Sequence, residues 1–253
     1  MTLKPDFSEP LLEVEQITKR FGGLLAVNSV SMKLFRGQVH ALIGPNGAGK
    51  STLVNLISGD TRPTFGRVYL QGADISGLPL HEVSQMGVAR SYQHRNVFFH
   101  FSAFENCRLA AQSRLRSSMR LFRPAYNYQG VNEAAARALD QVGLEHFDRI
   151  AATLSHGEIR QLEIAMSLAT EPEVLLLDEP LAGMGAEESV RMIELISKLA
   201  PHHAVLLVEH DMDAVFRLAN VLTVMVQGGV IASGDPATVK ANRAVQEAYL
   251  GTD

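Results

Sequence analysis

The feature that most constrains this chain is the glycine-rich segment at residues 44–51, GPNGAGKS. An apolar run at residues 38–43 precedes it and predicts a buried strand. The apolar residues that follow it have helical spacing, with Gly59 as the predicted stop. Strand, glycine turn and helix in this order predict a loop whose backbone N–H groups turn inward to hold phosphate oxygens. We therefore expect an α/β protein built around a nucleotide site.

Residues of this loop have separate predicted roles. Lys50 is expected to reach the β- and γ-phosphates of ATP, and Ser51 to bind Mg²⁺. The alternative is an ordinary glycine turn, which the flanking strand and helix disfavour. The predicted nucleotide-binding set comprises Gly44, Pro45, Asn46, Gly47, Ala48, Gly49, Lys50, Ser51 and Thr52.

A second segment, VLLLDEP at residues 174–180, carries two acidic side chains. A buried strand here delivers both carboxylates to its C-terminal end, which is where α/β sheets bind ligands. Asp178 is predicted to hold Mg²⁺ through water, and Glu179 to be the general base that activates the attacking water. Alone, the segment is also compatible with a solvated turn. Downstream of a phosphate loop, it predicts nucleotide hydrolysis.

Composition narrows the class of protein. With 253 residues, 46% of them apolar, the chain suits one well-packed α/β domain. A formal charge of -4 argues against nucleic-acid partners, which require an excess of Lys and Arg. The single cysteine, Cys107, forms no internal disulfide, and no secretion signal is recognisable. The apolar runs are much shorter than the roughly 20 residues of a transmembrane helix, so we expect a cytoplasmic protein for which any membrane role would run through a partner.

Local patterns predict the other elements. Residues 11–34 favour an antiparallel strand meander, and residues 227–230 favour the turn of a late hairpin. Residues 96–153 have a helical pattern, with Asn132 as predicted N-cap and Gly143 as predicted C-cap. Beyond them, buried strands that alternate with helices predict a parallel sheet. These strands and helices are expected at residues 174–177, 186–199, 204–208 and 212–218.

The segment at residues 154–158, LSHGE, resembles the LSGGQ signature of the ABC ATPases, and like that signature it lies just before the acidic strand. Ser155 and Glu158 also form an S-x-x-E capping box, which alone would only start a helix. Both interpretations hold together, because a capped helix N-terminus also binds anions. Ser155 and Gly157 match the signature, whereas His156 and Glu158 depart from it.

The resemblance implies roles for three further residues. Gln93 matches the glutamine that senses Mg²⁺ and the attacking water and links the ATP site to the permease. His210, after a buried strand, matches the switch histidine that contacts the γ-phosphate. Phe21 occupies the place of the aromatic residue that stacks on adenine. Residues 181–184, LAGM, occupy the family's D-loop, which crosses the dimer interface; Met184 stands where many relatives have Asp, so only the loop is carried over.

The resemblance also implies the architecture. We expect a P-loop NTPase fold of the ABC nucleotide-binding type, with a RecA-like core, an N-terminal antiparallel β subdomain and an inserted α-helical subdomain. The whole chain, 1–253, would be a single ABC ATPase domain. Residues 11–95 and 170–253 would form the catalytic core with the β subdomain, and residues 96–169 the helical subdomain that carries the signature.

Several segments resemble the ATP-binding subunits of branched-chain amino acid uptake systems, among them KRFGGL at 19–24 and EAYLG at 247–251. This resemblance implies ATP hydrolysis that powers solute import, and a position on the inner face of the cell membrane. The implied partners are membrane permease subunits, a second ABC ATPase subunit, identical or not, and a periplasmic solute-binding protein. The alternatives are the ATPase of a lipid or lipopolysaccharide exporter, and a soluble ABC ATPase that moves no solute. The solute is not encoded in this chain, because the binding protein and the permease select it.

Overall fold

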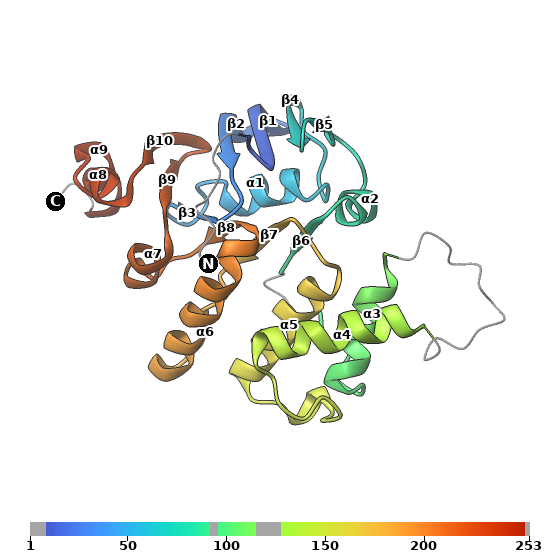
Figure 1. The fold of residues 1–253 in the computed structure, drawn as a ribbon. Coiled ribbons are helices and arrows are strands. Elements are labelled where there is room, and N and C mark those ends of the chain that lie inside the picture. Colours follow the sequence, from blue (N-terminus) through green and yellow to red (C-terminus); the bar gives the residue numbers. More distant parts are fainter. Residues whose placement is uncertain (1–8, 92–95, 115–127, 251–253) are drawn as a thin grey trace.

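Two sheets with helices around them make up the fold, in a computed structural model that describes residues 9–91, 96–114 and 128–250 (Figure 1). The smaller sheet is antiparallel, and Leu12 pairs with Leu34 and Phe21 with Leu24 across its longest strands. This confirms the predicted meander. In spatial order the sheet contains β2 (Leu24–Leu34), β1 (Leu12–Phe21), β4 (Phe65–Leu70) and β5 (Ala73–Asp74).

The larger sheet is parallel except for one edge strand, as predicted. Its central strands are apolar and buried along their full length, because helices or the smaller sheet cover both faces. Asp178 and Leu42 both pair with Val208, so the carboxyl ends of three neighbouring strands lie at one edge. The spatial order is β10 (Gly229–Gly234), β9 (Val221–Val226), β3 (Gln38–Ile43), β8 (Ala204–Val208), β7 (Val174–Asp178) and β6 (Val88–Arg90).

Alternating side chains of β7 separate two cores. Leu176 packs with the smaller sheet and with helix α1 (Lys50–Ile57), whereas Leu175 and Leu177 pack with α5 (His156–Ala169) and α6 (Ala186–Leu199). Helix α1 begins directly after the glycine loop and ends just before Gly59, close to the predicted bounds. The phosphate loop is therefore held between two packed layers.

Three helices pack against one another, and their core is continuous with one face of the larger sheet: α3 (Ala103–Gln112), α4 (Gln129–Val142) and α5 (Figure 1). The prediction of Asn132 as the N-cap of α4 was wrong, because the helix begins one turn earlier, after Tyr128. That turn adds the buried Val131 to the apolar stripe of the helix. Gly143 ends the helix in the left-handed conformation, with φ 69°, as predicted.

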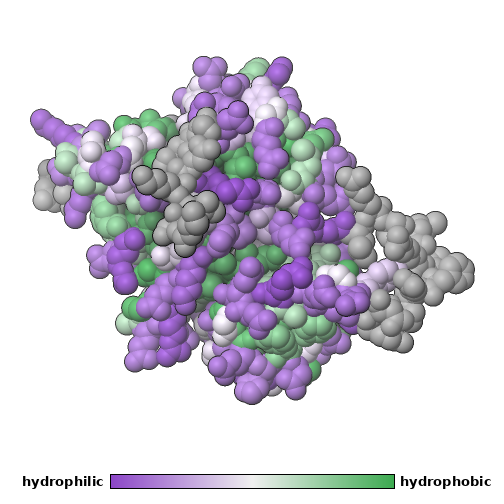
Figure 2. All heavy atoms as spheres, viewed as in Figure 1, coloured by the Kyte–Doolittle hydropathy of each residue, from purple (hydrophilic) through white to green (hydrophobic). Residues whose placement is uncertain are grey.

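The remaining elements complete the chain. Figure 2 shows hydrophilic and hydrophobic side chains interspersed over one face of the molecule. Within the described residues, no helix combines the length and the apolar character needed to span a membrane. The further helices are α2 (Leu80–Gln85), α7 (Met212–Leu218), α8 (Pro236–Lys240) and α9 (Arg243–Leu250), with short 3₁₀ turns at Ala151–Thr153 and Ala200–His202.

Candidate active site

The glycine loop between β3 and α1 is closely packed against two neighbouring strands. A Cβ on Gly44 would lie 2.2 Å from the carbonyl oxygen of Met225, and one on Gly49 would lie 2.3 Å from that of Ala26. Gly49 also has φ +99°, a conformation that L side chains rarely adopt. The N–H of Gly228, in the β9–β10 turn, donates to the carbonyl of Ala48 over 3.0 Å. These contacts fix the loop backbone from both sides.

Lys50 is the cation of this loop, and only 6% of its surface is exposed. Its ammonium group donates to the carbonyl oxygens of Gly44 at 2.6 Å and Pro45 at 3.2 Å. Burial lowers the pKa of Lys50, while the nearby carboxylates of Glu179 and Asp178 act in the opposite direction. A positive charge therefore lies where incoming phosphates would be bound.

A cavity of about 590 Å³ opens at the loop, within the size range of small-ligand sites. Phe21 stands at its rim with half of its surface exposed, and the ammonium of Lys19 lies 4.9 Å from the centre of its ring. The cavity thus combines an accessible aromatic face with the phosphate loop. Of the predicted site residues, those that line it are Phe21, Asn46, Gly47, Ala48, Gly49, Lys50, Ser51, Thr52, Glu179 and His210.

Two of the three predicted catalytic side chains, those of Glu179 and His210, meet at this cavity. Oε1 of Glu179 lies 2.6 Å from Nε2 of His210, within hydrogen-bond distance. Glu179 follows β7 directly, and its N–H donates to the carbonyl of Val208 at the end of β8. The parallel register of the two strands therefore brings together residues that lie 31 positions apart in the sequence.

Asp178 lies behind Glu179 with 1% of its side chain exposed. Its Oδ2 accepts a hydrogen bond from the guanidinium of Arg90 at 3.2 Å, whereas its Oδ1 is buried without a partner among the residues the structure describes. Burial raises the pKa of Asp178, and the charge of Arg90 acts against that rise. A buried carboxylate oxygen with no partner suits a hydrated Mg²⁺ ion. The Asp178 carboxylate therefore fits the predicted metal.

Two charged residues at strand ends were missed by sequence reasoning. Arg90, at the end of β6, also donates to Oδ1 of Asn55 on α1 at 2.5 Å. Glu209, one residue after β8, is 97% buried: it has 3% relative exposure, and its carboxylate accepts from backbone N–H groups. The sequence signal for both is a charged residue at or directly after the end of an apolar strand, but this signal does not identify the partner of either residue.

The signature residues lie elsewhere on the molecule. Ser155 caps α5, accepts from the N–H of Glu158 at 3.2 Å and donates its own N–H to the Glu158 carboxylate at 2.7 Å, which confirms the predicted capping box. Partial burial opposes the ionised form, but hydrogen bonds from Ser155 and Arg149 lower the pKa of Glu158. A Cβ on Gly157 would lie 2.8 Å from Oε1 of Glu188 on α6. None of these signature residues lines the cavity at the phosphate loop, and Gln93 lies outside the described residues.

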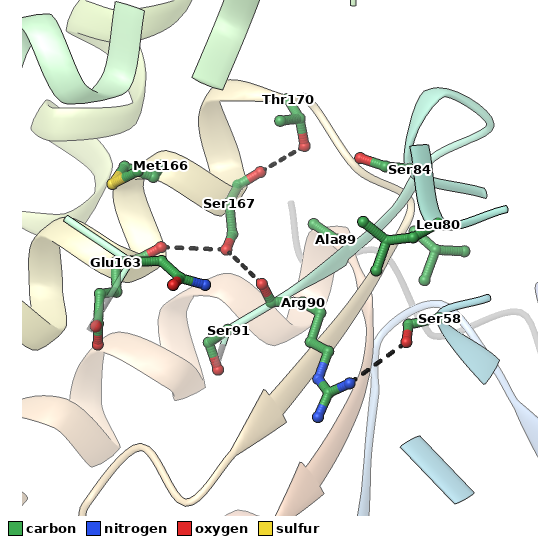
Figure 3. Close-up of a pocket in the computed structure, with 12 residues that line it drawn as sticks. Ser58, Leu80, Ser84, Ala89, Arg90, Ser91, Glu163, Met166, Ser167 and Thr170 are labelled. Atoms are coloured by element: carbon green, nitrogen blue, oxygen red, sulfur yellow. Dashed lines mark hydrogen bonds between the residues drawn. The ribbon is translucent and has the colours of Figure 1, made fainter. Parts of the chain in front are cut away.

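A second cavity, of about 200 Å³, lies between β6, α2 and α5 (Figure 3). Leu80 and Ser84 of α2 face Met166 and Ser167 of α5 across it. The guanidinium of Arg90 reaches from the wall of this cavity towards Ser58 and Asp178. Arg90 therefore lines this cavity and also contacts Asp178 at the end of β7.

Comparison with known families agrees with this geometry. A family profile described as "ABC transporter" matches residues 27–182. The chain belongs to the ABC transporter family. A further profile, "Branched-chain amino acid ATP-binding cassette transporter", matches residues 230–253 of this ABC protein.

Curated relatives and solved structures cover nearly the whole ABC chain. It is 40% identical to the high-affinity branched-chain amino acid transport ATP-binding protein LivG of Escherichia coli K12, across 96% of this chain and 99% of LivG. It is 42% identical to BraF of Pseudomonas aeruginosa, described as a high-affinity branched-chain amino acid transport ATP-binding protein, with the same coverage. A nucleotide-free ATP-binding cassette from an ABC transporter superposes with a TM-score of 0.86, at 30% identity and over 96% of this chain and 100% of that one. A cassette in its ADP conformation superposes with a TM-score of 0.84, at 30% identity and over 97% of this chain and 100% of that one. These matches confirm the predicted ABC nucleotide-binding fold.

Proposed function

We propose that this ABC ATPase hydrolyses ATP to power the import of branched-chain amino acids or related small solutes through a separate membrane permease. The observation that carries the proposal is the 2.6 Å contact between Glu179 and His210 at the mouth of the phosphate-loop cavity. It pairs a carboxylate with a histidine where the γ-phosphate of a bound ATP would lie. The similarity to LivG and BraF, both described as branched-chain amino acid transport ATP-binding proteins, supports the import of branched-chain amino acids.

The residues of the cavity have distinct proposed tasks. Phe21 stacks on the adenine, while the loop N–H groups and Lys50 hold the phosphates. Glu179 accepts a proton from the attacking water, and His210 orients that carboxylate and contacts the γ-phosphate.

Mg²⁺ has its own proposed ligands, and Asp178, Ser51 and Gln93 would hold it. When bound, the ion supplies positive charge that neutralises the transferring phosphate. Asp178 contributes a buried carboxylate oxygen that is not engaged by the residues the structure describes. Ser51 contributes a hydroxyl at the first turn of α1.

We propose that two cassettes pair head to tail, because the signature residues Ser155, Gly157 and Glu158 do not line the cavity of their own chain. In such a pair, the capped N-terminus of α5 in one chain faces the nucleotide of the other. The second cassette is either a copy of this chain or a similar subunit. ATP binding closes the pair, and hydrolysis reopens it.

The permease would dock at the cavity between β6, α2 and α5, whose lining residues Ser91 and Asn96 flank Gln93 in the sequence. Within one ABC domain, residues 96–169 would move as a helical subdomain against a core of residues 11–95 and 170–253. A periplasmic solute-binding protein completes the proposed complex, which places this chain on the cytoplasmic face of the membrane. Opening and closing of the cassette pair would be transmitted to the permease docked at the cavity between β6, α2 and α5.

ATPase activity of the purified chain beside a Glu179→Gln variant tests the proposal. We expect turnover that rises faster than linearly with protein concentration, falls by roughly 100-fold or more in the variant, and leaves the variant as an ATP-locked dimer. Glu187→Gln is the matched control, because that carboxylate is exposed on α6 and does not line the cavity. Equal turnover in wild type and Glu179→Gln would contradict the assignment of the base. A variant that stays monomeric with ATP and Mg²⁺ would contradict the pairing.

A further inference from the structure

Glu209 is a buried carboxylate that belongs to none of the tasks described so far. It follows the last residue of β8, and its two oxygens accept hydrogen bonds from two different loops. Oε1 accepts from the N–H of Leu181 at 2.9 Å, and Oε2 accepts from the N–H groups of His210 at 2.9 Å and Asp211 at 3.5 Å. One side chain thus links two segments that are separate in the sequence.

Both segments belong to the proposed catalytic machinery. Leu181 opens the D-loop, residues 181–184, which begins two residues after Glu179. His210 carries the imidazole that lies 2.6 Å from the Glu179 carboxylate. Glu209 therefore joins the backbone on the C-terminal side of the base to the backbone of the histidine that faces it.

The chemistry of this position favours a carboxylate. Burial of a charged group costs free energy unless hydrogen bonds compensate for it, and here burial raises the pKa of Glu209. A carboxylate has two oxygens that only accept, so it satisfies N–H donors on both sides at once. An amide has one oxygen and an NH₂ group that would point at an N–H donor. The side chain is therefore matched to linking two loops and not only to filling space.

We propose that Glu209 is a positioning residue that holds the D-loop and the switch histidine in one arrangement, so that His210 meets Glu179 only when the D-loop is in place. This inference rests on the proposed ATPase function. Because the D-loop is expected to cross the dimer interface, a cassette pair that shifts the D-loop would shift His210 as well. In each cassette, the contact between Glu179 and His210 would then depend on whether the interface with the second cassette is formed.

Glu209→Gln tests the inference, because it keeps the shape and removes one acceptor. We expect kcat to fall roughly 10-fold to 100-fold, since small misplacements of catalytic groups carry penalties of that size, while KM for ATP and the affinity for a fluorescent ATP analogue change less than about twofold. We also expect backbone amide hydrogen exchange to accelerate together in residues 179–185 and 209–212, with the phosphate-loop peptide unchanged. Asp235→Asn is the matched control, because the Asp235 carboxylate also accepts from two backbone N–H groups, at the start of α8.

The outcomes separate this inference from the proposed function. A wild-type chain without ATPase activity counts against the proposed function, whereas the exchange measurement still tests the link made by Glu209. Unchanged exchange at the D-loop, or a kcat equal to that of the wild type, would overturn the inference. So would parallel losses of kcat and ATP affinity in a folded Glu209→Gln protein, when Asp235→Asn shows neither loss. Should Glu209→Gln not fold, Glu209→Asp, which keeps both oxygens on a shorter stem, is expected to show the same split between kcat and KM.

Discussion

The guanidinium of Arg90 donates to the carboxylate of Asp178 at 3.2 Å. Both side chains are buried: 9% of Arg90 and 1% of Asp178 are exposed. The residues end neighbouring strands of the parallel sheet. The pair therefore stabilises the position of the proposed Mg²⁺ ligand from behind, next to the cavity where the permease would dock.

Breaking this pair from either side is expected to destabilise the fold. Arg90→Gln leaves a buried carboxylate without its cation, which costs about 3–5 kcal/mol in comparable pairs. Asp178→Asn removes the other charge, and the double variant is expected to be more stable than the sum of the single losses predicts. Urea unfolding of the four proteins without nucleotide measures this coupling. Strictly additive losses would show that the two side chains do not interact.

Alanine substitutions in the glycine loop are expected to differ in severity. At Gly47, φ is +80° and no atom lies within 4 Å of an added Cβ, so Gly47→Ala should cost only the roughly 1–2 kcal/mol of left-handed strain. Gly44→Ala and Gly49→Ala place a Cβ against backbone carbonyls and should abolish ATP-analogue binding or folding. Unfolding free energies of the three variants, together with titrations of an ATP analogue, give the order of their severity. Equal losses at all three positions would contradict the close packing.

Phe21 is expected to contribute to ATP affinity through its ring. Phe21→Ala should weaken ATP binding roughly 5-fold to 150-fold, because stacking of a base on an aromatic side chain is worth about 1–3 kcal/mol. Phe21→Tyr should bind ATP like the wild type. Phe65→Ala is the matched control, since Phe65 is an exposed phenylalanine that does not line the cavity. Binding of inorganic triphosphate, which has no base, should be unchanged in every variant, and a loss there would argue against stacking.

The local parts of this molecule follow from local sequence. The strand, glycine loop and helix at residues 38–57 form because apolar spacing and glycine positions act over a few residues. The capping box of Ser155 and Glu158 is local in the same way. The start of α4 was missed because Val131 belongs to a buried stripe that only becomes apparent once the helix packs on its neighbours.

The roles of Arg90 and Glu209 could not be predicted from the sequence, because their partners are distant in the chain. Arg90 lies 88 residues from Asp178, and Glu209 lies 28 residues from the N–H of Leu181. In a linear pattern, a charge at the end of a strand is equally compatible with a solvated turn. The register of the parallel strands decides which charges are buried together, and that register depends on the whole sheet.

The stability of the fold should depend on pH through His40, which lies inside the larger sheet. Burial lowers the pKa of His40 from 6.5 to about 4, and its Nε2 lies 2.7 Å from the hydroxyl of Thr223. The unfolded chain binds this proton below about pH 6.5, whereas the folded chain binds it only near pH 4. Between these values the unfolded state holds more protons, so the free energy of unfolding falls as the pH falls.

From pH 8 to pH 5 this group should remove about 2 kcal/mol of stability. His40→Gln should therefore flatten the pH dependence in that window, even if it lowers stability at pH 8. His81→Gln is the matched control, because His81 is exposed on α2 and should leave the slope of the wild type intact. Urea unfolding of the three proteins between pH 8 and pH 5 gives the slopes. If wild type and His40→Gln have the same slope, His40 is not the group whose protonation opposes folding. The acid sensitivity then arises from other groups, among them His203, whose pKa is also lowered by burial.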